Sequence, residues 1–169
     1  MAYTLQQLSD MEDIRQVANR YSHGVDRLDP DWMKSAYWPD ATDDHGIFVG
    51  NAHEFVDLCM VSHLPWRSTS HCIFNHSIEL DDDGIHGTGE VYNVTYLFKD
   101  DSQVLDTWVG RYLDEYEKRG DEWRIIRRVC VHEGTNTSDV ARMAIDSSGF
   151  RQGAFDRPSL GRPIGPGSE

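Results

Sequence analysis

Histidine and aspartate residues are placed along this sequence in a way that suits proton transfer. The chain has 8 histidines among 169 residues, and histidine is the side chain whose charge changes near neutral pH. Asp26 lies at the end of a helical pattern, and His71 lies on a later strand pattern. If the helix crosses that strand, Asp26 accepts a hydrogen bond from one nitrogen of His71 and leaves the other nitrogen as a general base. The alternative is that both groups lie at the surface without a catalytic role.

Tyr21 and His45 are two further candidates for catalysis. Tyr21 belongs to the apolar stripe of the same helix, so its hydroxyl either donates to a substrate oxygen or is satisfied by a neighbour within the core. His45 follows Asp43 and Asp44, which we expect to open the first strand. His45 then lies at the rim or wall of a pocket, or it belongs to a solvated strand entry. The spacing of histidines and acids there matches no zinc pattern, so no metal site is predicted.

The last strand pattern places Arg128, Cys130 and His132 on one face, because strand side chains alternate. Arg128 could stabilise the charge of a leaving oxygen or an enolate. It could equally form a salt bridge with Asp106 or Asp114 on the neighbouring strand. The residues expected to contact a ring-bearing apolar substrate are Arg128, His132, Asn75, Trp108 and Tyr112.

Helices are expected first along the chain. Apolar residues recur at helical spacing from Ile14 to Val25, and Ser9 with Glu12 has the pattern of a capping box. Asp29 and Pro30 form the cap and first turn of a second, short helix that runs to Ala36. A third helix is expected from Asn51 to His63.

The remainder of the chain is expected to form a sheet. Strands are predicted over His71–Leu80, Gly87–Phe98, Val104–Glu117 and Trp123–His132, with turns at 81–84 and 119–121. Within the first of these, Cys72, Phe74, Ile78 and Leu80 should share one face, and His71, Ile73 and Asn75 the other. Helices followed by an antiparallel meander predict an α+β fold with the helices on one face of a curved sheet.

Length and composition limit the classes of function. A chain of 169 residues fits one domain, which we expect over residues 1–146, followed by a Gly/Pro-rich tail over residues 147–169. The 16 basic and 29 acidic residues give a net charge of −13, which argues against binding nucleic acid or an anionic membrane. No apolar run approaches the ~20 residues that span a bilayer.

Other sequence signals point to a cofactor-free protein in the cytoplasm. The 3 cysteines match neither a zinc pattern nor a disulfide framework, so we expect reduced thiols. The N-terminus has no signal-peptide pattern. The chain has no phosphate-binding glycine loop, dinucleotide fingerprint or nucleophile elbow, so no cofactor is predicted.

Five stretches, in this order and spacing, resemble the SnoaL-like branch of the nuclear transport factor 2-like superfamily. The resemblance runs from about Leu8 to His132. The stretches are Ile14–Asp26, Pro39–Gly46, His71–Asn75, Gly110–Asp114 and Trp123–Arg128.

The resemblance implies a cone of a strongly bent sheet and three helices around an apolar pocket. Family members include dehydratases, a dehydrochlorinase, a ketosteroid isomerase and diarylpropane lyases. In dehydratase and dehydrochlorinase members an Asp on the first helix orients a His on the sheet, and Asp26 and His71 match those positions. Tyr21 matches a tyrosine that one dehydratase carries five residues before its Asp. Some relatives carry an Arg near the position of His132. The family also implies a homo-oligomer, a dimer or a trimer.

Three hypotheses follow for function. The first is a cofactor-independent lyase, for dehydratase-type elimination or related C–C or C–O cleavage. In it His71 removes a proton from a hydrophobic ring-containing substrate, and Tyr21, His45 or His132 assists the leaving group. An isomerase of the ketosteroid type begins with the same step. The second is a non-catalytic module that binds a small molecule. The third is a partner subunit of a monooxygenase-like or ring-hydroxylating enzyme.

Overall fold

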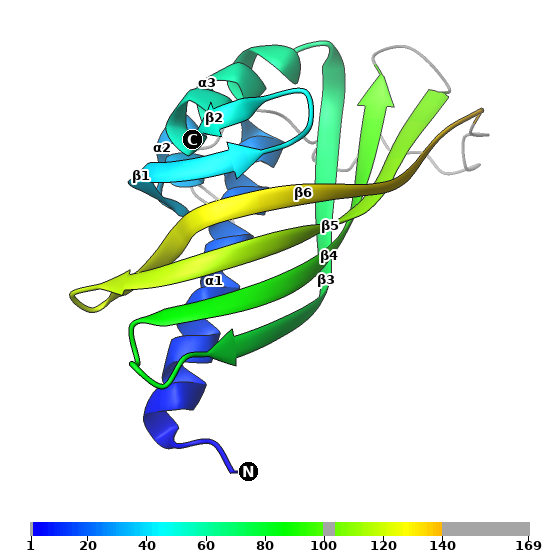
Figure 1. Cartoon of the computed structure of the whole chain (residues 1–169). Coiled ribbons are helices and arrows are strands. Elements are labelled where there is room, and N and C mark those ends of the chain that lie inside the picture. The colour runs from blue at the N-terminus through cyan, green and yellow to red at the C-terminus, as the bar shows by residue number, and fades with distance from the viewer. Residues whose placement is uncertain (1, 100–103, 140–169) are drawn as a thin grey trace, which may run out of the picture.

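The computed structural model describes residues 2–99 and 104–139, which form three helices and one six-stranded sheet (Figure 1). The helices are α1 (Leu5–Arg27), α2 (Pro30–Lys34) and α3 (Ala52–Ser62). The strands are β1 (Tyr37–Asp44), β2 (Val49–Asn51), β3 (Trp66–Leu80), β4 (His86–Lys99), β5 (Val104–Arg119) and β6 (Glu122–Asp139). The predicted α+β class is confirmed. The predicted domain boundary after residue 146 lies outside the described residues.

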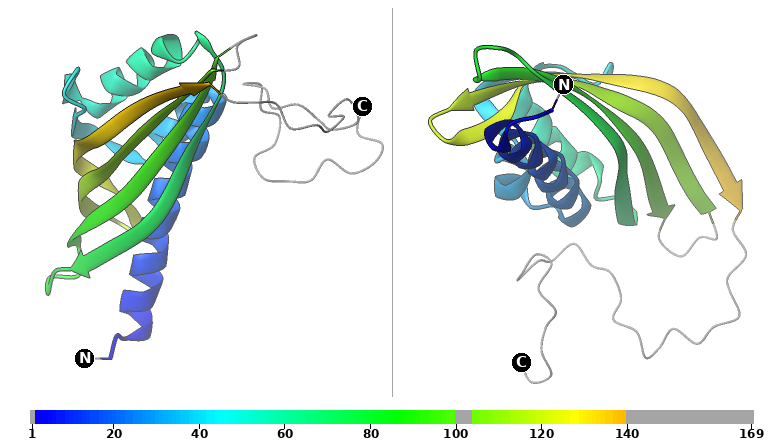
Figure 2. Two further views of the ribbon diagram at one scale, coloured as in Figure 1. Left: turned by 90° about the vertical axis from the view of Figure 1, so that its right-hand side faces the viewer. Right: turned by 90° about the horizontal axis from the view of Figure 1, so that it is seen from below.

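The sheet is mixed and strongly curved. Its strand order is β2-β1-β6-β5-β4-β3, in which β1 runs parallel to β6 and the other neighbours are antiparallel. The long strands bend around one side, and all three helices lie on that concave side (Figure 2). Helix α1 crosses the concave face and contacts both β3 and β6, so residues of the helix can meet residues of the sheet.

Helix α1 begins one turn earlier than the sequence pattern predicted. Thr4, not Ser9, is its N-cap, and the side chain of Gln7 completes the capping box. The sequence prediction was wrong here because Thr4 and Gln7 have the same spacing as Ser9 and Glu12, and the earlier pair starts the helix. The helix ends at Arg27, and its C-cap Leu28 adopts a left-handed conformation with φ of 54°.

The cap predicted for α2 is confirmed, and the structure adds a cap at the start of α3. The Asp29 side chain accepts a hydrogen bond from the backbone N–H of Trp32, with Pro30 in the first turn. Asn51 accepts from the backbone N–H groups of His53 and Glu54 at the start of α3. These caps satisfy backbone donors that a helix leaves unpaired at its N-terminus.

Asp43 and Asp44 end β1 rather than opening it, so the predicted position of this stretch was wrong. The strand begins at Tyr37, and its parallel pairing with β6 runs on to Asp44. His45 and Gly46 then turn the chain into β2, and Gly46 has a φ of 71°, a conformation that glycine adopts without strain.

A β-bulge in β3 changes which residues share a face. Ile73 pairs with Asn93 and His76 with Val91, so β3 carries one residue more than β4 between these pairs. Ile73 and Ile78 therefore both face the helices, where they join the core, whereas Phe74 is 57% exposed. The predicted alternation was wrong because it assumed a regular strand through Asn75.

The core lies between α1 and the concave face of the sheet. Helix α1 contributes a stripe of buried side chains, and the sheet contributes aromatic and aliphatic ones. Among them are Ile14, Val17, Val25, Tyr37, Tyr116, Trp123 and Ile125. No helix within the two described ranges is long and apolar enough to cross a membrane.

Gly24 packs tightly against Met33 of α2, and its replacement by alanine is expected to lower stability. An added Cβ would lie 2.5 Å from the Cβ and the backbone nitrogen of Met33. Alanine favours a helix by about 1 kcal/mol over glycine, but overpacking typically costs about 1–3 kcal/mol. Urea unfolding of Gly24→Ala should therefore show a lower free energy of unfolding; a rise would contradict the close packing of the two helices.

Candidate active site

The Asp26 carboxylate and the His71 imidazole meet between the last turn of α1 and β3. Asp26 Oδ1 lies 2.6 Å from His71 Nδ1, and Oδ2 accepts from the His71 backbone N–H at 2.8 Å. The Thr69 hydroxyl also donates to Oδ1 at 2.8 Å. The two side chains are only 12% and 8% exposed. The predicted contact of Asp26 with His71, shielded from water, is confirmed.

These hydrogen bonds decide the protonation states of the pair. Burial raises the pKa of Asp26, but the hydrogen bonds from His71 and Thr69 outweigh it and leave that pKa below its usual value. Asp26 is therefore an ionised acceptor, and His71 Nδ1 carries the proton that it receives. The nitrogen of a neutral His71 that can take a proton is Nε2. The negative charge of Asp26 stabilises the imidazolium that results.

Tyr21 links this pair to His45. The Tyr21 ring packs edge-on against His71 with centroids 6.4 Å apart, and its hydroxyl lies 3.4 Å from His45 Nε2. His45 Nδ1 is hydrogen-bonded to Asp43, and the His45 ring stacks on Phe55 with centroids 4.0 Å apart. The structure thus brings together all the residues that the sequence suggested as catalytic.

Two of the residues expected to contact the substrate, Tyr112 and Trp108, lie on β5 next to these side chains. The buried Tyr112 ring lies 5.5 Å from Tyr21 and 6.0 Å from His45 between centroids. Trp108 stacks against Tyr112 at 6.4 Å with an interplanar angle of 17°. Gly110 allows this position of the Trp108 indole, because a Cβ at residue 110 would lie 2.1 Å from the Trp108 ring. Aromatic surface therefore adjoins the acid–base groups.

Arg128 forms the buried ion pair with Asp114 that was one of its two expected roles. Its Nε and Nη2 each lie 2.7 Å from the Asp114 carboxylate, and both side chains are 0% exposed. The guanidinium also lies 4.1 Å from the ring centroid of Tyr112 and 4.4 Å from that of Tyr21. Arg128 is thus enclosed by Asp114 and the tyrosine rings, so its expected role of stabilising the charge of a leaving oxygen or enolate directly is not supported.

Asn75 and His132 are not brought to the Asp26–His71 pair. Asn75 is exposed within the bulge of β3. His132 is exposed and packs beside Trp108 with ring centroids 6.1 Å apart. A β-bulge in β6 follows His132. Gly110 of β5 pairs with His132, and Val109 pairs with Gly134, so the register shifts by one residue just beyond His132. Their expected role in substrate binding has no support from these positions.

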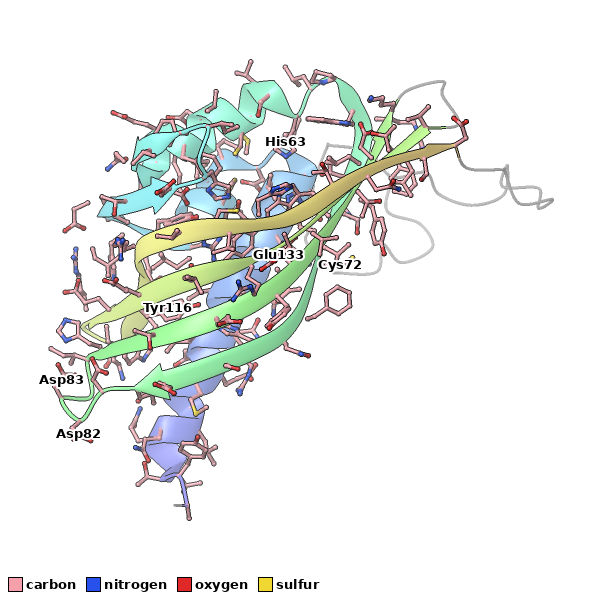
Figure 3. All side chains as sticks on the ribbon, turned by 45° about the vertical axis from the view of Figure 1, so that its right-hand side comes forward. His63, Cys72, Asp82, Asp83, Tyr116 and Glu133 are labelled. Atoms are coloured by element: carbon pink, nitrogen blue, oxygen red, sulfur yellow. The ribbon has the colours of Figure 1, made fainter. Side chains whose placement is uncertain are left out.

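Sequence reasoning missed His63, which lies beside His71 with ring centroids 6.0 Å apart. His63 is the C-cap of α3, and its Nδ1 lies 3.1 Å from the carbonyl oxygen of Cys59. Burial, followed by the charge of His71, lowers its pKa to about 4, so His63 is neutral at pH 7. It lies at the α3 end of the sheet, away from the Asp82–Asp83 turn (Figure 3). Its place at a helix end was the only available signal in the sequence.

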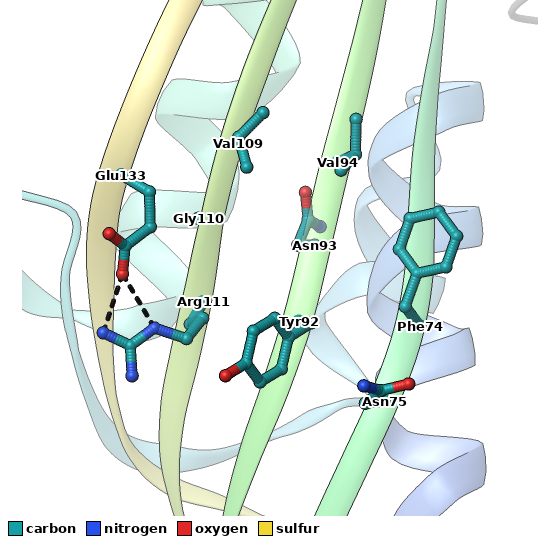
Figure 4. A pocket seen from close by; sticks show the side chains of 9 residues that line it. All are labelled: Phe74, Asn75, Tyr92, Asn93, Val94, Val109, Gly110, Arg111 and Glu133. Atoms are coloured by element: carbon teal, nitrogen blue, oxygen red, sulfur yellow. Dashed lines mark hydrogen bonds and ion pairs between the residues drawn. The ribbon is translucent and has the colours of Figure 1, made fainter.

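A separate hollow of about 640 Å³ lies on the convex face of the sheet. Figure 4 shows Phe74, Tyr92, Arg111 and Glu133 in front of the strands, with α1 behind them. Arg111 is paired with Glu133 and Glu90. No residue of the Asp26–His71 pair lines this hollow, so it is distinct from the candidate active site.

Comparisons with known proteins agree with this fold. A model of the SnoaL-like domain matches residues 6–129. A scytalone dehydratase-like protein from Novosphingobium aromaticivorans DSM 12444 is 17% identical, with 87% of this chain and 98% of that chain covered and a TM-score of 0.70. Hexachlorocyclohexane dehydrochlorinase LinA-type3 from Novosphingobium barchaimii LL02 is 19% identical, with 84% and 99% covered and a TM-score of 0.72.

A third solved structure, described as an NTF2-like protein with a cystatin-like fold from Novosphingobium aromaticivorans, is 16% identical and has a TM-score of 0.67 over 76% of this chain and 85% of that chain. No curated protein matched the sequence. The family match covers most of the chain and includes α1, β3 and the start of β6, on which the candidate site is built. The chain therefore belongs to the SnoaL-like domain family.

Proposed function

We propose that this protein is a cofactor-independent lyase that removes a proton and a leaving group from a hydrophobic, ring-containing small molecule. His71 Nε2 takes the proton from carbon, and Asp26 orients the imidazole and stabilises its positive charge. A steroid, a polyketide or a lignin-derived aromatic compound is the class of substrate that we expect.

The observation that carries this proposal is the buried contact between Asp26 and His71. The pair is held by three hydrogen bonds to one carboxylate, at 2.6–2.8 Å. Water weakens the electrostatic interaction within a surface Asp–His pair. Asp83 and His86 are such a pair, because they have the same 2.6 Å contact but are 46% and 47% exposed. Burial thus distinguishes the Asp26–His71 pair, which can act as a base, from the exposed Asp83–His86 pair at a turn.

Departure of the leaving group is assigned to Tyr21 and His45. Both lie within hydrogen-bond distance of each other, and Tyr21 also contacts the His71 ring. His132, the third residue considered for this step, is exposed beside Trp108. The rings of Trp108 and Tyr112 are proposed to bind the apolar part of the substrate.

The reaction type can be tested with a panel of ring compounds that carry an acidic C–H next to a carbonyl and a hydroxyl, chloride or aryloxide on the neighbouring carbon. Mass spectrometry should detect loss of water, HCl or phenol, and the rate should be unchanged by EDTA. Products of unchanged mass with a shifted double bond would instead identify an isomerase. Ligands that bind without any product, and without exchange of the acidic proton in D₂O, would identify a binding module and reject the lyase.

Assembly and location are proposed from the family and the composition. A homo-oligomer, dimer or trimer, is expected, and the convex face of the sheet exposes apolar side chains including Phe74, Tyr92 and Val109. The cytoplasm is the expected location, and neither nucleic acid nor a membrane is an expected partner.

A further inference from the structure

A second carboxylate–imidazole pair lies across Tyr21 from the first. His45 Nδ1 is bonded to Asp43, and these side chains are 15% and 0% exposed. The Tyr37 hydroxyl donates to the other Asp43 oxygen at 2.7 Å, and Phe55 stacks on the His45 ring. These contacts restrict rotation of the imidazole and hold its Nε2 near the Tyr21 hydroxyl, at 3.4 Å.

An elimination needs an acid for the leaving group as well as a base for the proton. Burial, reinforced by the neighbouring Tyr112 and Tyr37, raises the pKa of Tyr21 well above its usual value. Tyr21 alone is therefore a poor acid, because a buried phenolate would be left behind. An imidazolium within hydrogen-bond distance can replace the proton as it leaves, and Asp43 balances the charge of His45 in that state.

We propose that Asp43 is a positioning residue for an acid relay, in which Tyr21 protonates the leaving group and His45 reprotonates Tyr21. The inference rests on the proposed lyase function and supplies its acid half. His71 Nε2 takes the proton from carbon, and the electron pair of that C–H bond forms the double bond. The bond from the next carbon to oxygen breaks, and its electron pair accepts the Tyr21 proton, while Tyr21 receives the Nε2 proton of His45. Exchange with water then removes the proton from His71 and restores the proton of His45.

The relay predicts a dependence on the leaving group. Two aryl ethers of β-hydroxybutanone serve as probes, one that releases para-nitrophenoxide and one that releases para-methoxyphenoxide. The first leaving group needs little protonation and the second needs more. Asp43→Asn should lower kcat about 100-fold for the methoxyphenyl ether and only about 3-fold for the nitrophenyl ether, with KM changed little. His45→Gln, at a partly exposed position, should show the same pattern if Asp43→Asn folds poorly.

The control is Asp44→Asn, which removes the same charge from the neighbouring residue. Asp44 accepts a hydrogen bond from the Gly46 backbone, whereas the carboxylate hydrogen-bonded to His45 Nδ1 is that of Asp43, so both probes should be turned over at the wild-type rate. Equal losses for the two ethers in Asp43→Asn would overturn the relay while leaving His71 as the base. If the wild-type protein releases neither phenol, the lyase function itself fails, and the relay with it.

A second readout tests the positioning directly and needs no substrate. In protein labelled with ¹⁵N-histidine, the Nδ1 proton of His45 should give a downfield resonance that is absent from His45→Gln. Asp43→Asn should shift this signal upfield, whereas Asp44→Asn and Asp26→Asn should leave it in place. A His45 Nδ1 signal that does not respond to Asp43→Asn would overturn the assignment of Asp43 as the residue that orients the ring.

Discussion

Replacement of His71 by glutamine is expected to lower kcat for elimination by about 10²–10⁴-fold, the usual contribution of a positioned general base. Glutamine keeps much of the volume and polarity of histidine but cannot take the proton. Because His71 acts in the chemical step, the dissociation constant of a non-reactive ketone ligand should stay within a few-fold of the wild-type value. Steady-state kinetics and calorimetric binding measure the two effects separately.

The matched control for this variant is His86→Gln. His86 also forms a 2.6 Å contact with an aspartate, Asp83, but the pair is exposed at the turn between β3 and β4. His86→Gln should leave kcat unchanged. A His71→Gln protein that retains wild-type turnover would reject His71 as the base, and a loss of folding would be seen in the circular dichroism spectrum.

Replacement of Asp114 by alanine is expected to destabilise the protein by about 3–5 kcal/mol, because it leaves the charge of Arg128 buried without a counter-ion. Both side chains are 0% exposed, and Arg128 Nη1 has no hydrogen-bond partner among the residues that the structure describes. The tyrosine rings around Arg128 offset part of the loss. Urea unfolding at pH 7 measures the change in free energy.

The neighbouring residue Glu115 provides the comparison. Its pair with Arg127 has a similar 2.7 Å contact, but the two side chains are 50% and 57% exposed. Glu115→Ala should therefore cost no more than about 1 kcal/mol. If Asp114→Ala cost no more than Glu115→Ala, the ion pair of Arg128 would not be a major contributor to the stability of the core.

The contact of Asp26 with His71 could be predicted from sequence because two independent signals agreed. The apolar stripe of α1 fixes the face on which Tyr21 lies, and Asp26 follows at the end of the helix. The family resemblance then matched Asp26 and His71 to residues that meet in relatives. Neither signal alone specifies a contact between residues 45 positions apart.

Residue types alone do not decide between Asp106 and Asp114 as the partner of Arg128, because the choice depends on strand register. The turn after Arg119 pairs that residue with Glu122, and the register that follows places Asp114 opposite Arg128 and Asp106 opposite Thr137. Hairpin geometry therefore decides between the two aspartates, although the bulge near Tyr116 shifts the register by one residue.

Asn75 and Asp43 could not be placed correctly for physical reasons. The bulge in β3 arises from pairing with β4, which a pattern of alternating side chains does not reveal. The extent of β1 depends on a parallel partner, β6, that follows more than 70 residues later in the chain. Tertiary pairing thus decides where β1 ends and Asp43 lies, whereas the residue types of Asp26, His71, Tyr21 and His45 already single them out in the sequence.

A crystal structure with a bound, non-reactive analogue of an eliminated ketone would test the central claim most directly. We expect the carbon that bears the transferable proton to lie about 3–3.5 Å from His71 Nε2, with the hydrogen bonds from His71 to Asp26 intact. A ligand seated only in the hollow on the convex face of the sheet, or one whose acidic carbon lies far from His71, would contradict the assignment of this pair as the base.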